Sequence, residues 1–127
     1  MLLRRDDEIV ESLPLGDPAS FNSRPILVPS KVDTLETATN SIVCRSGRVE
    51  PGDSYLLLSD SIAAWYLRLW REDGSRTQAL AFEEFVARSS YEDLQLLLNG
   101  GRECGLLRND DIAAIIVRVR QDIDVSE

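Results

Sequence analysis

The sequence predicts an α+β fold with mainly antiparallel strands, in a single domain that spans residues 1–127. Three patterns indicate this class. Short apolar or alternating segments stand in the first half of the chain, segments with helical spacing follow, and a run rich in β-branched residues comes near the end. Strands first, helices next and a strand last favour antiparallel pairing, because neighbouring antiparallel strands need no helical crossover between them.

The first fifteen residues predict a β-hairpin, in which LLRR and IVESLPL flank a polar turn at residues 6–8. From Gly16 to Asn40 the chain contains three prolines with Ser, Asn and Thr between them, which predicts a long loop. A loop of this length in a small domain is often functional or lies over a larger body.

Two further strands are predicted in the stretch SIVCRSGRVEPGDSYLLLS, with turns at Ser46-Gly47 and at residues 51–53. The segment Tyr55 to Leu58 is apolar at every position. Because it is apolar on both faces, we expect it in the middle of a sheet.

An amphipathic helix with an aromatic face is predicted from Ile62 onward and is expected to close at Gly74. Its aromatic residues are Trp65, Tyr66 and Trp70. They could form a ligand platform, but an aromatic stripe at helical spacing more often belongs to a hydrophobic core.

Two shorter helices are predicted within FEEFVARSSYEDLQLLLNGG, the second capped by Ser89 or Ser90 and ended by Gly100-Gly101. IAAIIVRVR, residues 112–120, then predicts a core strand, which the chain approaches through the polar turn at residues 108–111. The tail DIDVSE is expected to fray.

Composition excludes several functional classes. The net charge of −8 opposes binding to nucleic acid, because phosphate backbones would be repelled. The chain has no histidine, which excludes Ser-His-Asp, Cys-His and histidine acid–base catalysis. Its two cysteines, Cys44 and Cys104, lack zinc-site spacing, and we expect both to be small buried side chains.

No apolar run approaches the roughly 20 residues that a membrane-spanning helix needs, and acidic residues interrupt the N-terminal segment where a signal peptide would be apolar. These features predict a soluble cytoplasmic protein without a membrane partner.

Acidic residues stand at the ends of two predicted strands. Asp60 follows one strand, and Asp110 with Asp111 precedes another. If the two strands are neighbours, these carboxylates lie at the same edge of the sheet, where they could bind Mg²⁺ or Mn²⁺. Asp60 could instead cap the following helix, and Asp110 with Asp111 could simply form a polar turn.

A family resemblance rests on GDSYLLLSDSIAAWYL, on the helices that follow it, on RNDDIAAIIVRV and on Pro14 to Ser30. These segments resemble the C-terminal half of the metal-dependent protein phosphatases of the 2C type, the PPM family, and its bacterial phosphatase-like branch in particular. The resemblance covers nearly the whole chain but about half of the family's domain. It implies a partial phosphatase 2C-like fold.

The resemblance also implies a chemistry. Asp60 and Asp110 match two metal-binding aspartates, Asp111 stands at an Asn position and receives no ligand role, and no residue is catalytic beyond the metal-bound water. In the family, that water attacks the phosphorus of phosphoserine or phosphothreonine in a protein substrate. We therefore expect Mg²⁺ or Mn²⁺ as the cofactor and a phosphorylated protein as the substrate of an active form.

Several departures from the family pattern qualify this expectation. The chain has no early Asp-Gly motif to supply the remaining aspartate and no matching phosphate-binding arginine, because Arg4 and Arg5 stand too late in the pattern. Ala113 replaces a Ser or Thr, and Ser61 replaces a Gly or Ala. We expect a truncated or split phosphatase, or else a non-catalytic remnant that serves as an interaction module. Its open sheet edge could pair with a second copy or with a complementary subunit.

Overall fold

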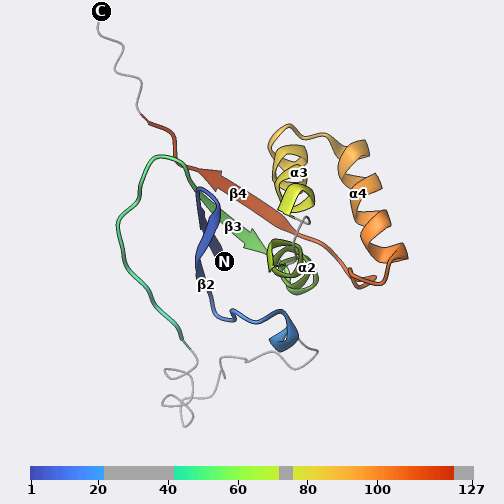
Figure 1. Cartoon of the computed structure of the whole chain (residues 1–127), viewed down its shortest axis with the longest axis horizontal. Helices are drawn as coiled ribbons and strands as arrows, with labels where there is room; N and C mark the ends of the chain where they lie inside the picture. The colour runs from blue at the N-terminus through green and yellow to red at the C-terminus, as the bar shows by residue number, and fades with distance from the viewer. Residues whose placement is uncertain (22–41, 72–75, 122–127) are drawn as a thin grey trace, which may run out of the picture.

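The computed structural model describes residues 1–21, 42–71 and 76–121 and shows an α+β fold (Figure 1). The elements, in chain order, are β1 Leu2–Arg5, β2 Glu8–Ser12, the short 3₁₀ helix η1 Pro18–Ser20, β3 Asp53–Leu58, α2 Asp60–Arg71, α3 Arg76–Ala87, α4 Tyr91–Glu103 and β4 Ala114–Arg118.

The four strands form one antiparallel sheet in the order β2-β1-β3-β4. The predicted N-terminal hairpin is confirmed as β1 and β2, whose register shifts between Leu3 and Arg4 at a β-bulge. β1 and β4 flank β3 on its two sides, so the expectation that residues 55–58 lie in the middle of the sheet is also confirmed.

The hydrophobic core lies between one face of the sheet and helices α2 and α3. Leu2 and Leu56 point from the sheet into a cluster that contains Trp65, Tyr66 and Phe82. The Trp65 ring meets the edge of the Phe82 ring, with the two centroids 5.8 Å apart. These aromatic side chains are therefore core residues and form no exposed ligand platform.

Helix α2 is amphipathic, as predicted: its exposed residues Asp60, Arg68 and Arg71 form a narrow polar stripe, and the other side chains are buried. Helix α4 contacts Trp65 of α2 closely at Gly101. A Cβ atom at this position would lie 3.0 Å from Nε1 of Trp65 and 3.3 Å from Cβ of Leu107. Glycine therefore allows α4 and the following loop to approach the Trp65 indole closely.

No described element covers the opposite face of the sheet, which we call the open face. Leu57 on β3 is 47% exposed, and Ile115 and Val117 on β4 are 62% and 50% exposed. The helices cover the face of Leu56, while the side chain of its neighbour Leu57 points to the other face because strand side chains alternate.

Several boundaries also differ from the prediction. Residues 42–50 form no strand and run as an exposed segment before β3. Helix α3 begins at Arg76, six residues before the expected Phe82, and α4 continues through Gly100-Gly101 to Glu103. Ser90 occupies the N-cap position of α4, as predicted, but its hydroxyl donates to Asp93 Oδ2 at 2.6 Å and makes no bond to the helix backbone.

The last strand is an edge strand, so its prediction as a core strand is right in type and wrong in position. Both cysteines are exposed free thiols, which overturns the expectation that Cys44 and Cys104 are buried. The remainder of the predicted loop at 22–40, the closing Gly74 and the C-terminal tail at 122–127 lie outside the described residues.

Candidate functional site

The C-terminal end of β3 and the start of β4 lie side by side at one end of the sheet, which we call the Asp60 edge. It is distinct from the edge strands β2 and β4. Ser59 joins β3 to β4: its backbone N–H donates to the Ala113 carbonyl at 2.9 Å, and its Oγ accepts from the Ala113 N–H at 3.1 Å. The same hydroxyl donates to the Asp111 carbonyl at 3.4 Å. Because the strands are antiparallel neighbours, the residues that follow β3 and those that precede β4 share this edge.

Asp60 lies at this edge, in the first turn of α2. The carbonyl of Ser59 accepts the bond from the Ala63 N–H at 2.9 Å, so Ser59 occupies the capping position and Asp60 is the first helical residue. The carboxylate of Asp60 is solvent-exposed at the positive end of the helix dipole. The alternative that Asp60 is the N-cap itself is therefore wrong by one residue.

Asp110 and Asp111 lie in the turn that leads to β4, and both are exposed. Asp110 Oδ1 accepts from the Asp111 N–H at 2.9 Å, and the Asp110 carbonyl accepts from the Arg102 guanidinium at 3.1 Å. These bonds fit the polar-turn alternative and leave the second carboxylate oxygen of Asp110 without a protein partner among the described residues.

The donor set at this edge is chemically suited to a hard divalent cation but is incomplete. Carboxylate oxygens are the ligands that Mg²⁺ and Mn²⁺ prefer, and Asp60 and Asp110 offer them from two adjacent chain segments. Within residues 1–21, 42–71 and 76–121, however, no group of three or more Asp, Glu, Cys or His side chains is placed to hold a metal ion. The described residues alone do not make a closed metal site.

One buried oxygen lies next to Asp60. The Ser61 side chain is 3% exposed, and its Oγ has no hydrogen-bond partner in the described part of the chain. A buried hydroxyl without a partner is uncommon, since it loses its bonds to water on burial. It adds a polar atom beside the edge that carries the two aspartates.

The most strongly perturbed electrostatic site lies elsewhere and was missed by the sequence analysis. Glu83 on α3 is fully buried and accepts two hydrogen bonds from Arg4 on β1, at 2.9 and 2.8 Å. The Tyr66 hydroxyl donates to the same carboxylate at 2.7 Å. Arg4 also contacts the face of Trp70, with its guanidinium 5.9 Å from the ring centroid.

The pKa values in this buried network follow from its charges. Burial raises the pKa of Tyr66 above its usual value, and the nearby Glu83 charge raises it further. Burial alone would lower the pKa of Arg4, but the hydrogen bonds and charge of Glu83 raise it. Both shifts favour a neutral Tyr66 and a charged Arg4, and the buried cluster ties β1 to α2 and α3.

The sequence carried a signal for this network. Strand side chains alternate, so Arg4 shares a face with the buried Leu2. Glu83 lies four residues after Ala79 and directly after Phe82, on the helix side that is buried. An arginine and a glutamate on two buried faces predict a buried ion pair, although the two lie 79 residues apart.

Arg5 forms a second ion pair, on the open face of the sheet. Its guanidinium donates to both oxygens of Asp53, at 2.8 and 2.9 Å, and Asp53 Oδ2 also accepts from the Glu50 N–H at 2.9 Å. These hydrogen bonds lower the pKa of Asp53 to about 2. The same pairing raises the pKa of Arg5.

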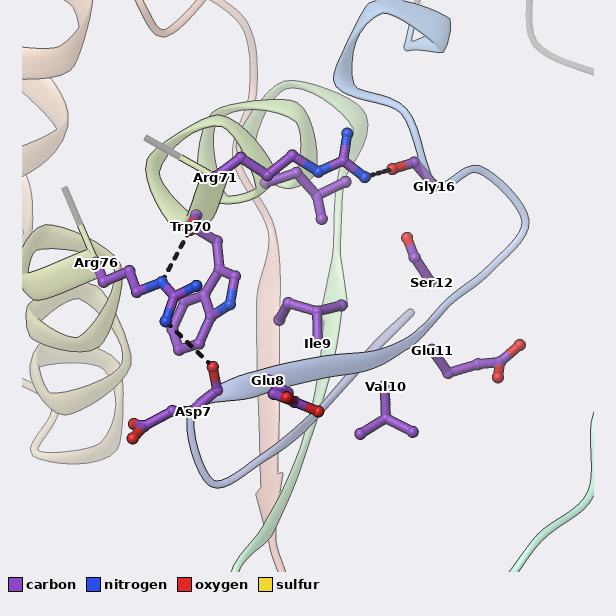
Figure 2. Close-up of a pocket in the computed structure, with 11 residues that line it drawn as sticks. Asp7, Glu8, Ile9, Val10, Glu11, Ser12, Gly16, Trp70, Arg71 and Arg76 are labelled. Atoms are coloured by element: carbon purple, nitrogen blue, oxygen red, sulfur yellow. Dashed lines mark hydrogen bonds between the residues drawn. The ribbon is translucent and has the colours of Figure 1, made fainter. Parts of the chain in front are cut away.

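A pocket of about 450 Å³ lies between β2 and the C-terminal end of α2 (Figure 2). Trp70 and Ile9 form its inner part. Figure 2 shows Arg76 reaching the carbonyls of Trp70 and Asp7, and Arg71 reaching the carbonyl of Gly16. The pocket contains none of the predicted site residues, and its two arginines connect α2 and α3 to the hairpin.

Comparison with known protein families, with curated proteins and with solved structures finds no match to this chain. Across the described residues, no helix is both long enough and apolar enough to cross a membrane.

Proposed function

We propose that the chain is the C-terminal, metal-binding half of a PPM-type protein serine/threonine phosphatase domain. In this proposal, hydrolysis of phosphomonoesters becomes possible only when residues from outside the chain complete the site. The observation that carries it is the common edge of Asp60 and Asp110, which flank two neighbouring antiparallel strands and are both exposed. A phosphatase 2C-like identity of the fold belongs to the same proposal.

The arrangement supports this assignment in two ways. The two segments that carry the family resemblance are joined by three helices and return to form adjacent strands, so aspartates 50 positions apart share an edge. The oxygen donors are also of the right kind for Mg²⁺ or Mn²⁺, which accept few carboxylates and several waters. Asp60 and Asp110 would hold the ion, which when bound would supply an acidified water for attack on phosphorus.

The proposal also accounts for the incomplete donor set. Two carboxylates leave most of the coordination sphere of a divalent ion to water or to other residues. We therefore expect weak metal binding by the chain alone and no phosphatase turnover by it. Its proposed substrate is a phosphorylated protein, and its proposed compartment is the cytoplasm.

Isothermal titration calorimetry with Mn²⁺ tests the proposal on the intact chain. We expect Asp60→Asn and Asp110→Asn each to weaken binding at least about tenfold, because each removes one charged ligand. Asp111→Asn is the matched control, since it removes the adjacent exposed carboxylate, which has no assigned ligand role. Binding that is unchanged in both ligand variants, or equally weakened in the control, contradicts the proposal.

A second candidate function is a non-catalytic interaction module that keeps the scaffold. It is favoured by the lack of a three-ligand acidic cluster among the described residues and by the exposed apolar side chains of Leu57, Ile115 and Val117. The same titration separates the two candidates, because the module requires no metal binding at the Asp60 edge. A neighbouring reading frame that encodes the missing Asp-Gly half would favour the split phosphatase.

A further inference from the structure

The two edges of the sheet differ in how well they are protected against pairing with another strand. β2 forms one edge, and it carries Glu8 and Glu11 and pairs with β1 through a bulge. Arg76 and Arg71 also bind the backbone on either side of β2 (Figure 2). Charges, bulges and flanking contacts are the usual means by which an edge strand avoids a partner.

β4 forms the other edge, and it shows none of these protections among the described residues. Its sequence is AIIVR, its register with β3 is regular over all five residues, and its only charge is the terminal Arg118. Residues of this kind have high β propensity. β4 is therefore the edge that is competent to accept another strand.

The backbone groups that face outward from β4 follow from the hydrogen bonds on its inner side. Val119 bonds to Gly52 and Asp53 through its C=O and N–H, and the Ala113 C=O bonds to Ser59. Because backbone groups of an antiparallel strand alternate in direction, the odd-numbered residues between them also face β3. The N–H and C=O groups of residues 114, 116 and 118 consequently face the free edge.

We propose that β4 pairs with β4 of a second copy of this chain, antiparallel and about a two-fold axis at Ile116. In this register Ala114 of each copy lies opposite Arg118 of the other, and every outward backbone group finds a partner. Each of the three facing pairs exchanges two hydrogen bonds, about six in all. The result is one continuous sheet, with the helices of both copies on the same side.

The charges at the two ends of β4 favour a second copy in this orientation. The strand is preceded by Asp110 and Asp111 and followed by Arg120, and these three side chains are exposed, whereas Arg118 at the end of the strand pairs with Glu84 of its own chain at 2.8 Å. Antiparallel self-pairing brings the acidic start of one strand beside the basic end of the other. This local attraction opposes the general repulsion expected between two chains of net charge −8.

The exposed apolar residues of β4 match across the same axis. Ile115 of one copy faces Val117 of the other in a non-hydrogen-bonded pair, where Cβ atoms approach to roughly 4.5–5.5 Å. These two side chains are 62% and 50% exposed in the single chain, so the pairing covers part of their surface. The two-fold axis places a second, identical pair of Val117 and Ile115 on the other side of Ile116.

Sedimentation velocity of the full chain, over a roughly hundredfold range of concentration, tests the pairing. We expect a species of twice the 14.2 kDa chain mass whose share rises with concentration and falls with salt. Ala114→Pro removes an outward N–H and no bond to β3, so it should leave a folded monomer by circular dichroism. Val10→Lys, an exposed position on the open face near the β2 edge, is the control and should still dimerise.

A cysteine cross-link tests the register even if the proline variant does not fold. In a background with Cys44→Ser and Cys104→Ser, a mixture of Ile115→Cys and Val117→Cys chains should form a disulfide between the two variants. Ile115→Cys alone should not, because diagonal positions lie about 7–8 Å apart, beyond disulfide reach.

Three results would overturn the pairing: a monomer at every concentration, a dimer that persists in folded Ala114→Pro, or efficient cross-linking of Ile115→Cys with itself. None of them bears on the Asp60 and Asp110 proposal, since metal binding uses side chains of one copy.

Discussion

The two faces of the sheet carry the same kinds of residues but use them differently. On the covered face, Leu56 and the ion pair of Arg4 with Glu83 are enclosed by α2 and α3. On the open face, Leu57 is half exposed, and the partly exposed Arg5 pairs with Asp53, which is buried. Adjacent residues of one strand therefore lie in different environments, one facing the core and the next facing the open side, because strand side chains alternate between the two faces.

The difference indicates where the free energy of folding resides. Burial strengthens both hydrophobic contacts and charge interactions, and it makes an unpaired charge expensive. The covered face therefore determines stability, whereas the open face and the β4 edge retain apolar surface that a partner can cover. Three experiments test this contrast, from the largest expected effect to the smallest.

Removal of the buried charge at Glu83 should have the largest effect. Glu83→Gln leaves the Arg4 guanidinium without its counter-charge and should lower the free energy of unfolding by about 3–5 kcal/mol. Glu84→Gln on the same helix is the control, since Glu84 pairs with Arg118 and Arg88 at the surface and should contribute less than about 1 kcal/mol. Urea unfolding measures both, and equal losses would remove the contrast.

Truncation of two adjacent leucines on β3 should give the next largest difference in stability between the two faces. Leu56→Ala creates a cavity in the core and should reduce the free energy of unfolding by about 2–5 kcal/mol. Leu57→Ala removes a side chain that is 47% exposed and should reduce it by less than about 1 kcal/mol at concentrations where the chain is monomeric. A large loss at Leu57 would mean that the open face is covered.

Acid should lower the stability of the protein through protonation of Asp53, on the open face. Its pKa is lowered to about 2 by Arg5 and by the Glu50 N–H, so the unfolded chain binds this proton more readily. The stabilisation is complete above about pH 4, the ordinary range of the group, and is lost as the pH falls through about 2.

Urea midpoints between about pH 5 and pH 2 measure this dependence. Asp53→Asn removes the titrating group and Arg5→Gln removes the main cause of the shift, so both variants should show a shallower loss of stability in acid. An unchanged slope in both would show that Asp53 does not carry the effect.

Much of the fold could be predicted from local patterns. The alternation before and after residues 6–8, the apolar run at 55–58 and the helical spacing after Ile62 identify the hairpin, the central strand and α2. The strand predicted at 42–50 is absent. Apolar residues such as Val43 and Val49 gave the segment a strand-like pattern, but it pairs with no described strand and is exposed. Gly100 and Gly101 were predicted to end the helix, but α4 continues through them, because Gly101 lets the helix lie close to Trp65.

The candidate site was only partly predictable for a related reason. The sequence places Asp60 and Asp110 at strand ends, but whether those ends are neighbours depends on sheet order, which local patterns leave open. The adjacency of β3 and β4 is what brings the two aspartates to one edge. The Glu83 network required knowledge of which helix face meets which strand face.

By itself, the sequence determined the type of most elements, the lack of histidine and the aromatic core helix, because these depend on spacing and composition within one segment. Only the tertiary structure decided that Arg4 meets Glu83, that the described helices cover one face of the sheet and not the other, and that β4 lies at an edge. The physical reason is that burial and pairing are properties of two segments together, and their free energies arise only when distant parts of the chain meet.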